Sequence, residues 1–386
     1  MYQFSLDAYT TLFVHSLQRA QHSDDLQERN ENIKSVHTLA VYTNTCRGLF
    51  EEHKLLFSFC LAVKIQKAGD QRSPGRVNPD EYLYLLRGPV GMNLEAVEGG
   101  TKPEWLGDRE WEMIIGLGTL PAFEGIASSF EQYNDDWHEW YMEQEPESQP
   151  FPGEWTRKCS LMQSMVIVRC LRPDRVMSCV RSYVIQTLGQ EFVIPPPLDL
   201  GLALSDSDAY TPLLFVLSPG VDPLIQLKQF AIQCNKQDDF HDLALGQGQA
   251  DAARELILDG SQKGWWVYLG NCHLMLSWMD TFEGIMEEIS LSKINDNFRL
   301  WLSSDPNPKF PISVLQKSVK MTTESPSGLR ANMTALLASI NAEQFEKTTN
   351  NYKILVFSLC FLHSVIIERR KFLTLGWNIP YPFNRS

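Results

Sequence analysis

The hydrophobic pattern of the chain changes near its middle. Up to about residue 192, apolar positions recur every three or four residues, for example within residues 4–17 and 159–192. This spacing predicts amphipathic helices, and the polar stretch 21–32 predicts a connector between the first two of them. Residues 194–200 then read IPPPLDL. Three successive prolines fit neither a helix interior nor a central strand, so we predict a domain boundary there.

Beyond the three prolines, short apolar runs alternate with segments of helical periodicity. Each run has the length and composition of a buried strand. The alternation predicts an α/β fold: a five-stranded parallel sheet with flanking helices, preceded and followed by all-helical subdomains. The predicted strands lie within residues 213–217, 240–249, 265–271, 298–304 and 319–324, and helix returns from about residue 343.

Composition and charge narrow the classes of function. The 386 residues are 44% hydrophobic and 21% charged, which is typical of a globular protein with two or three cores. A formal net charge of −13 argues against a nucleic-acid partner, because phosphate binding needs a basic surface. Eight scattered cysteines include no CxxC pair, so no metal site is expected. The longest apolar run, residues 354–367, is short for a bilayer span. We therefore expect a soluble protein with no membrane partner.

A concentration of tryptophans allows two interpretations. Exposed indoles can bind sugars or aromatic ligands, whereas buried indoles anchor helices and loops. We favour anchoring, because tryptophan buries a large apolar area and its N–H needs a single partner. The residues are Trp105, Trp111, Trp137, Trp140 and Trp155.

The turn after the first strand stands where nucleotide-binding folds hold a phosphate. A Walker loop surrounds the phosphates with backbone amides and supplies a lysine to their oxygens. This turn has no lysine, and each of its two prolines removes an amide donor. Asp222 would also occupy the positive end of the following helix. We therefore predict a degenerate phosphate loop with no catalytic residue, formed by Ser218, Pro219, Gly220, Val221 and Asp222.

The ends of the later strands carry few reactive groups. A Walker B acid would stand at Gly270 and Asn271, and an asparagine cannot act as a base. Ser303 and Ser304 end the fourth strand. They could contact a phosphate, as sensor residues do, or cap the chain before a proline. Arg330, near a predicted helix start, could face a nucleotide, a neighbouring subunit or solvent.

Two further patterns are weaker. Residues 246–250 read GQGQA, which is not GxGxxG and predicts a simple turn into a helix beginning near Asp251. Cys272 and His273 are adjacent, and adjacent side chains point apart, which disfavours a nucleophile and base pair. The chain contains neither HExxH nor GxSxG, so zinc-protease and serine-hydrolase functions have no motif support.

Taken in order, these motifs resemble the C-terminal motor region of dynein heavy chains. The downstream set is LLFVLSPGVDP (213–223), LALGQGQ (243–249), GWWVYLGNCHLMLSWM (264–279), NFRLWLSSDPNPKF (297–310) and FSLCFLHSVIIERRKF (357–372). The upstream set is MYQFSLDAY (1–9), RGLFEEHKLLFSF (47–59), YLLRG (84–88) and RCLRPDRV (169–176). MYQFSLDAY and FPGEW (151–155) look most like axonemal inner-arm heavy chains.

The resemblance implies a domain order within a ring of six AAA+ modules. Residues 1–95 look like the small helical subdomain that ends the fifth module, and residues 96–200 like a Trp-rich helical lead-in. Residues 201–340 look like the α/β large part of the sixth module, with a degenerate nucleotide site. Residues 341–386 look like the start of its helical lid. No coiled coil is expected.

The resemblance also implies a function. In this family other modules bind ATP and magnesium, and the sixth module lacks a functional nucleotide site. The region would be a noncatalytic ring segment of a microtubule motor, which closes the ring and relays conformational change without a cofactor of its own. Implied partners are the neighbouring modules and the dynein intermediate and light chains. Microtubules would be reached only through a stalk outside these residues, in the cytoplasm and cytoskeleton and especially the axoneme.

Two alternatives remain open on sequence grounds. The chain could be a stand-alone AAA+-like nucleotide-binding protein with an unorthodox site. It could also be a truncated interaction protein that keeps the fold without the motor. On the ring-segment reading, the isolated chain should expose apolar surface and self-associate.

Overall fold

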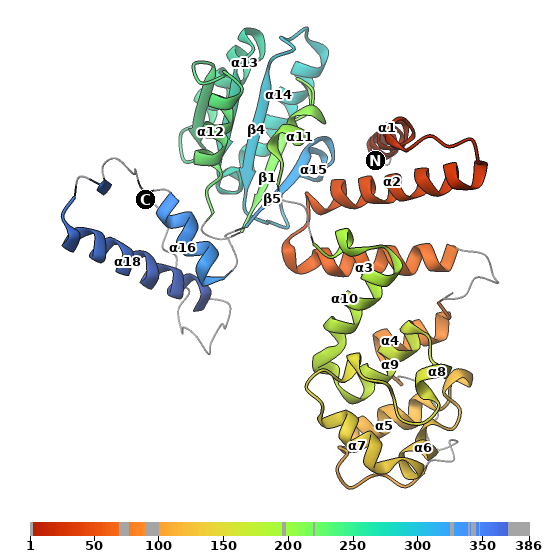
Figure 1. Cartoon of the computed structure of the whole chain (residues 1–386). Helices are drawn as coiled ribbons and strands as arrows, with labels where there is room; N and C mark the ends of the chain where they lie inside the picture. The colour runs from red at the N-terminus through yellow and green to blue at the C-terminus, as the bar shows by residue number, and fades with distance from the viewer. Residues whose placement is uncertain are drawn as a thin grey trace. The chain divides into compact units, whose positions relative to one another are not determined.

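The computed structural model describes most of the chain and divides it into two compact units. The first unit is Met1–Phe50 with Pro196–Ser386, and the second is Glu51–Pro195 (Figure 1). One division thus falls inside the proline-rich segment, whose residues 195–197 lie outside the described residues. The other falls inside the predicted 1–95 segment. The described residues are 3–68, 77–89, 100–194, 198–218, 221–324, 328–338, 340, 345–346 and 348–369.

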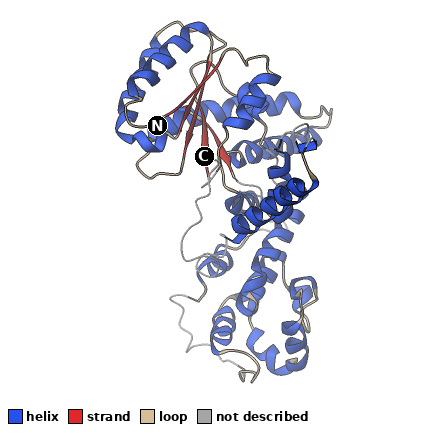
Figure 2. Ribbon diagram, turned by 90° about the vertical axis from the view of Figure 1, so that its left-hand side faces the viewer, coloured by secondary structure: helices blue, strands red, loops and turns tan. Residues whose placement is uncertain are grey.

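The first unit is built on a five-stranded sheet in which all four strand pairs are parallel. The strand order is β2-β3-β4-β1-β5. Helices flank the strands (Figure 2). Each strand lies within a predicted segment, so the predicted fold class is confirmed. The strands are β1 (Leu213–Leu217), β2 (Phe240–Ala244), β3 (Trp266–Gly270), β4 (Arg299–Ser304) and β5 (Val319–Thr323).

Successive residues of a strand point to opposite faces of the sheet, and both faces carry apolar side chains. Helices cover each face and bury those side chains. Phe215 and Trp301 pack with α11 (Leu200–Ser205) and α12 (Leu224–Gln233). The neighbouring Leu214 and Leu300 pack on the other face. That face is covered by α13 (Ala250–Lys263), α14 (Met279–Leu291) and α15 (Ile312–Lys317), and the 3-10 segment Cys272–Trp278 leads into α14.

The N-terminal helices α1 (Gln3–Arg19) and α2 (Leu26–Cys46) pack against each other. The predicted connector 21–32 is wrong in its second half, because α2 already begins at Leu26. Asp25 caps α2 by accepting a hydrogen bond from the Gln27 amide at 3.1 Å. Arg29 donates to the Leu17, Ala20 and Gln21 carbonyls at the end of α1. Polar residues of this stretch therefore cap helix ends. They show no apolar periodicity, so the sequence pattern did not reveal this helix start.

Residues 47–49 fasten this helix pair to the sheet. The Thr322 amide of β5 donates to the Arg47 carbonyl at 2.8 Å, and the Thr322 hydroxyl donates to the Leu49 carbonyl at 2.8 Å. The Arg47 guanidinium also pairs with Asp206 at 2.7 Å. The chain thus covers the β5 edge of the sheet. This is why the first 50 residues belong with the α/β unit.

The second unit is helical, as the sequence predicts. Ser160 and Gln163 form a capping box at the start of α9, and Pro173 opens a 3-10 turn before α10. The helices are α3 (Glu51–Ala68), α4 (Pro79–Arg87), α5 (Asp108–Leu117), α6 (Ile126–Gln132), α7 (Asn134–Met142), α8 (Trp155–Lys158), α9 (Leu161–Leu171) and α10 (Val176–Thr187). Short 3-10 turns lie at Pro121–Phe123, Pro146–Ser148, Pro173–Arg175 and Gln190–Phe192.

The tryptophans of this unit form an aromatic core. Trp137 is fully buried and stacks on Phe130, with ring centroids 4.5 Å apart. Trp140 and Phe151 pack against the same indole. Trp105 is only partly buried, and its N–H donates to Asn134 at 3.0 Å. This arrangement supports the anchoring interpretation.

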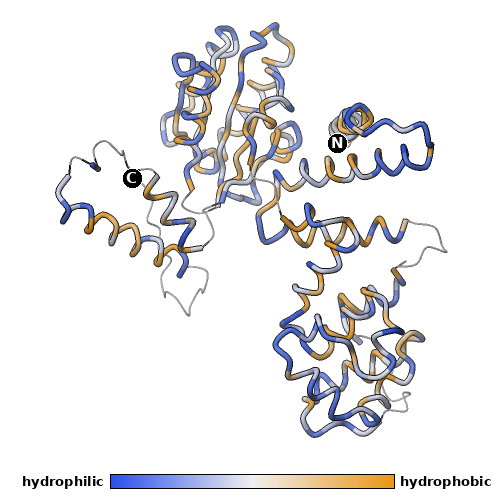
Figure 3. The backbone as a smooth tube through the Cα atoms, in the orientation of Figure 1, coloured by the Kyte–Doolittle hydropathy of each residue, from blue (hydrophilic) through white to orange (hydrophobic). Residues whose placement is uncertain are grey.

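The C-terminal helices α16 (Leu329–Ala338) and α18 (Asn350–Arg369) pack together. Glu368 accepts hydrogen bonds from the Gly328 amide and the Asn332 side chain, which caps α16. The run 354–367 was expected to be short for a bilayer span, but α18 has 20 residues and is long and apolar enough to cross a membrane by length and composition alone. Core helices of soluble proteins pass the same test when mostly buried, whereas 6% of this stretch is buried. Most of α18 is hydrophobic (Figure 3). Many of its apolar side chains are exposed, namely Tyr352, Ile354, Leu355, Phe357, Leu359, Phe361, Leu362 and Val365.

Candidate functional site

Parallel strands present their carboxyl ends at one edge of a sheet, where ligands bind in α/β folds. Ser218 directly follows β1, and Asn271 directly follows β3, which ends at Gly270. Ser303 and Ser304 are the last residues of β4. The predicted residues of the three strand ends thus lie at one edge. Arg330 has an exposed side chain on α16, and Pro219 and Gly220 lie outside the described residues.

Three amides at and beside the phosphate-loop position are engaged within the protein. The Ser218 amide donates to the Thr323 carbonyl at 2.9 Å, and the Val221 amide donates to the Ser218 carbonyl at 3.2 Å. The Leu224 amide donates to the Asp222 carboxylate at 3.0 Å. Pro223 has no amide proton to offer. A phosphate would need several of these donors directed at its oxygens.

The charge at the start of α12 also opposes a phosphate. A helix N-terminus carries a partial positive charge, which favours anions. Here the Asp222 carboxylate already accepts from the first helical amide. A bound phosphate would have to lie beside that negative charge. The described residues of this loop therefore do not fit ATP with magnesium.

The centre of the edge is closed by a hydrogen-bond network around Ser303. The Tyr268 hydroxyl donates to the Ser303 Oγ at 2.8 Å, and the Asn271 amide donates to the same oxygen at 3.1 Å. Ser303 is fully buried, and Asn271 adopts a left-handed backbone with φ 60°. Burial raises the pKa of Tyr268, which keeps the phenol protonated as a donor. A sensor serine would direct its hydroxyl at a phosphate, whereas the Ser303 hydroxyl is already engaged by Tyr268 and Asn271.

Tyr268 is a site residue that our sequence reasoning missed. It lies opposite Trp301 in the strand register, and Ser303 is two residues further along β4. Residues two apart on a strand share a face, so Tyr268 and Ser303 are on the same side of the sheet. The alternation of residues along β3 assigns Tyr268 to one face of the sheet. That face could be linked to Ser303 only once β3 and β4 were known to be neighbours.

Cys272 and His273 have separate partners. Burial raises the pKa of the Cys272 thiol to about 12, and the thiol faces the Leu269 carbonyl at 3.6 Å. His273 Nδ1 accepts from the Asp305 amide at 3.1 Å, and its Nε2 lies 3.7 Å from the Asp305 carboxylate. A nucleophile needs an available thiolate and an adjacent base. These two residues instead tie the 3-10 segment to the ends of β3 and β4.

The remaining candidates are structural or lack ligands. Residues 246–249 form a turn in which the Gln249 amide donates to the Gly246 carbonyl at 3.2 Å. Gly248 has φ 82°, and α13 begins at Ala250, so the prediction of a simple turn into a helix is confirmed. Within the described residues, no group of three or more His, Cys, Asp or Glu side chains is placed to hold a metal ion.

The Ser303 network predicts an asymmetric pair of mutational effects. Ser303→Ala leaves the Tyr268 hydroxyl and the Asn271 amide without their acceptor, and should lower the free energy of unfolding by about 2–4 kcal/mol. Tyr268→Phe leaves Ser303 with one donor and should cost about 1 kcal/mol. Urea denaturation of both variants and of the double variant measures the coupling. A Ser303→Ala cost no larger than that of Tyr268→Phe would contradict the network.

Comparison with known protein families matches two regions of the first unit, the sheet with its helices and the C-terminal helical region. Residues 208–322 match the family described as dynein heavy chain region D6 P-loop domain. Residues 352–386 match the dynein heavy chain AAA lid domain. The first match spans the sheet up to Thr322 of β5, and the second includes most of α18.

Individual relatives align with this chain from end to end. The chain is 49% identical, over its entire length, to dynein axonemal heavy chain 2 of Homo sapiens. It is 46% identical, again over its whole length, to the dynein-1-beta heavy chain of the flagellar inner arm I1 complex of Chlamydomonas reinhardtii. It spans only 9% and 8% of these two relatives. The chain therefore belongs to the dynein heavy chain family, in which it corresponds to the D6 P-loop domain, the AAA lid domain and the helical region before them.

Proposed function

We propose that this chain is a noncatalytic ring segment of an axonemal dynein motor. The observation that carries the proposal is an intact AAA+ type sheet whose ligand edge is closed by its own residues. The loop amides bond within the protein, and Tyr268 and Asn271 engage Ser303. ATP and magnesium would act in other modules of the heavy chain, by in-line attack of water, and this region needs no cofactor.

The proposed domain assignment follows the family order. Residues 1–95 would end the fifth AAA+ module, and residues 96–200 would lead into the sixth. Residues 201–340 would form its α/β part and residues 341–386 the start of its lid. Partners would be the neighbouring modules of the same heavy chain, with dynein intermediate and light chains elsewhere in the complex. Because the quoted relatives are axonemal or flagellar, we place the motor in the axoneme.

Two features suit a segment that relays motion. The bonds from Thr322 to Arg47 and Leu49 tie the N-terminal helices to the sheet within one compact unit. Forces applied to either part would therefore move the other. The exposed apolar surface of α18 suits a helix that packs against further protein in a ring. The lid match likewise favours protein contact over a membrane for this helix.

Nucleotide binding by the purified 386-residue chain tests the proposal. A ligand that binds only the folded state at 100 times its Kd adds about 2.7 kcal/mol of stability. We expect about 1 mM ATP with magnesium to shift the melting temperature by less than about 1 °C, because the site lacks donors. ATP turnover that is abolished by changes in residues 218–223 would instead support a stand-alone enzyme.

Sequencing the transcript distinguishes the ring segment from the second alternative, a truncated interaction protein. A reading frame that continues upstream into further AAA+ modules supports the ring segment. A stop directly upstream would favour a truncated interaction protein. Neither the stand-alone enzyme nor the truncated interaction protein is favoured by the closed ligand edge or by the match of the whole chain to motor heavy chains.

A further inference from the structure

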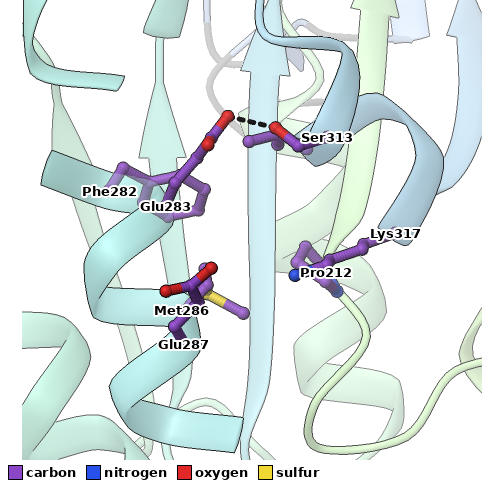
Figure 4. A pocket seen from close by; sticks show the side chains of 8 residues that line it. Pro212, Phe282, Glu283, Met286, Glu287, Ser313 and Lys317 are labelled. Atoms are coloured by element: carbon purple, nitrogen blue, oxygen red, sulfur yellow. Dashed lines mark hydrogen bonds between the residues drawn. The ribbon is translucent and has the colours of Figure 1, made fainter. Parts of the chain in front are cut away.

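A groove lies between α14 and α15, on the sheet face opposite α12 (Figure 4). Its volume is about 380 Å³, part of which is open to solvent. The enclosed part of the groove is smaller than an ordinary ligand pocket, about 300–1,000 Å³, and suits a side chain rather than a small molecule. Apolar and charged side chains share the lining, which is Pro212, Phe282, Glu283, Met286, Glu287, Ser313, Val314 and Lys317.

The apolar part of the groove is preformed. Phe282 and Val314 belong to the buried core beneath the two helices, with 1% and 5% of their surfaces exposed. Met286 is partly buried and packs against that core. Methionine is unbranched and adapts its shape to a neighbouring side chain. The groove can therefore accept one large aliphatic side chain without opening the core.

The rim of the groove is acidic. Glu283 and Glu287 lie one turn apart on α14, a helix that contains no lysine or arginine. The Ser313 hydroxyl donates to Glu283 and holds that carboxylate at the groove. The adjacent Glu288 pairs with Arg254 at 3.3 Å, whereas no ion pair engages Glu283 or Glu287 among the described residues. Lys317, on α15, is the single cation of the lining.

Exposed apolar residues continue beyond the groove on both helices. Leu291 follows Glu287 by four residues, which places both on one face of α14, and 90% of its surface is exposed. Ile312, at the start of α15, is 64% exposed. These two side chains add exposed apolar surface on the helices that form the groove.

We infer that the α14–α15 groove binds an amphipathic helix of another polypeptide, which inserts an aliphatic side chain above Met286 and sets lysine or arginine against Glu283 and Glu287. Helices dock in grooves through apolar side chains spaced by three or four residues. Opposite charge on the flanking positions adds specificity. A second copy of this chain is a poorer occupant, because each copy carries a formal net charge of −13.

Peptide binding to the 386-residue chain tests this docking. The probes are two helical peptides of about 15 residues with the same leucine pattern. One carries lysine at the polar positions and the other carries glutamate. Fluorescence anisotropy at about 150 mM salt, where the Debye length is about 8 Å, measures their affinities. We expect the lysine peptide to bind about tenfold more tightly.

Groove variants make the test specific. Glu283→Gln with Glu287→Gln should weaken binding of the lysine peptide about fivefold. The matched control is Asp251→Asn with Glu255→Gln, which removes two exposed acids one turn apart on α13 and should change little. Met286→Trp fills the groove and should weaken binding about tenfold.

Three results would overturn the inference. One is equal binding of the lysine and glutamate peptides, which leaves no role for the acidic rim. Another is an equal loss of affinity in the α13 control variant, which would show attraction to net charge alone. The third is a dimer, detected by sedimentation, that Met286→Trp dissociates, because the occupant would then be a second copy of the chain.

Discussion

Replacement of Trp301 by alanine is expected to destabilise the α/β unit by about 3–5 kcal/mol, a large share of the stability of most domains. Trp301 lies in β4, fully buried, with its ring centroid 5.9 Å from that of Phe215 and 5.6 Å from that of Trp266. Alanine would leave a cavity beneath α12 that the flanking strands cannot close. The expected fall in melting temperature is about 10 °C.

Trp301→Phe is the matched control. The indole N–H of Trp301 is buried with no hydrogen-bond partner among the described residues. Phenylalanine keeps most of the apolar contact and removes that unpaired donor, so its cost should be well under half that of alanine. Small and equal costs for the two variants would show that packing at this position does not support the sheet.

Replacement of Trp137 by alanine should cost the helical unit about 3–5 kcal/mol for the same physical reason. Trp137 is fully buried and stacks on Phe130, and its N–H is also unpartnered among the described residues. If the tryptophans formed a ligand site, this variant would stay folded and lose only binding. If they are anchors, the variant loses structure.

Hydrogen exchange read by mass spectrometry locates each loss. Trp137→Ala should reduce protection within residues 100–194, and Trp301→Ala within residues 198–324, because contacts concentrate inside each unit. Trp137→Phe, which retains the stack on Phe130, should change protection little. Loss of protection spread evenly over both units by either variant would contradict this division.

Local patterns determined the elements of the fold. All five strands lie within the predicted segments. The inner strands β1 and β3 are short, continuous apolar runs that no neighbour is needed to define, whereas the edge strands β2 and β5 carry polar residues and are only partly buried. The α9 and α10 helices lie within residues 159–192, where the apolar periodicity predicted helix. Where local chemistry involved polar residues alone, as at the start of α2, the pattern misled.

The sequence also predicted which chemistry the phosphate-loop position lacks. The missing lysine and the two prolines are properties of residues, and they hold in any conformation. What the remaining groups do instead is a matter of conformation. The Ser218 amide bonds to Thr323, which follows it by more than one hundred residues. No local signal connects those two positions.

By itself, then, the sequence determined the strands, most helices and the absence of a phosphate-binding lysine, because these depend on neighbouring residues. The tertiary structure alone decided that Tyr268 meets Ser303, that residues 47–49 cover the β5 edge, and that acids of α14 flank an apolar groove with α15. Each of these joins segments far apart in the chain. Their contacts depend on strand order and helix packing, which hydrophobic periodicity does not encode.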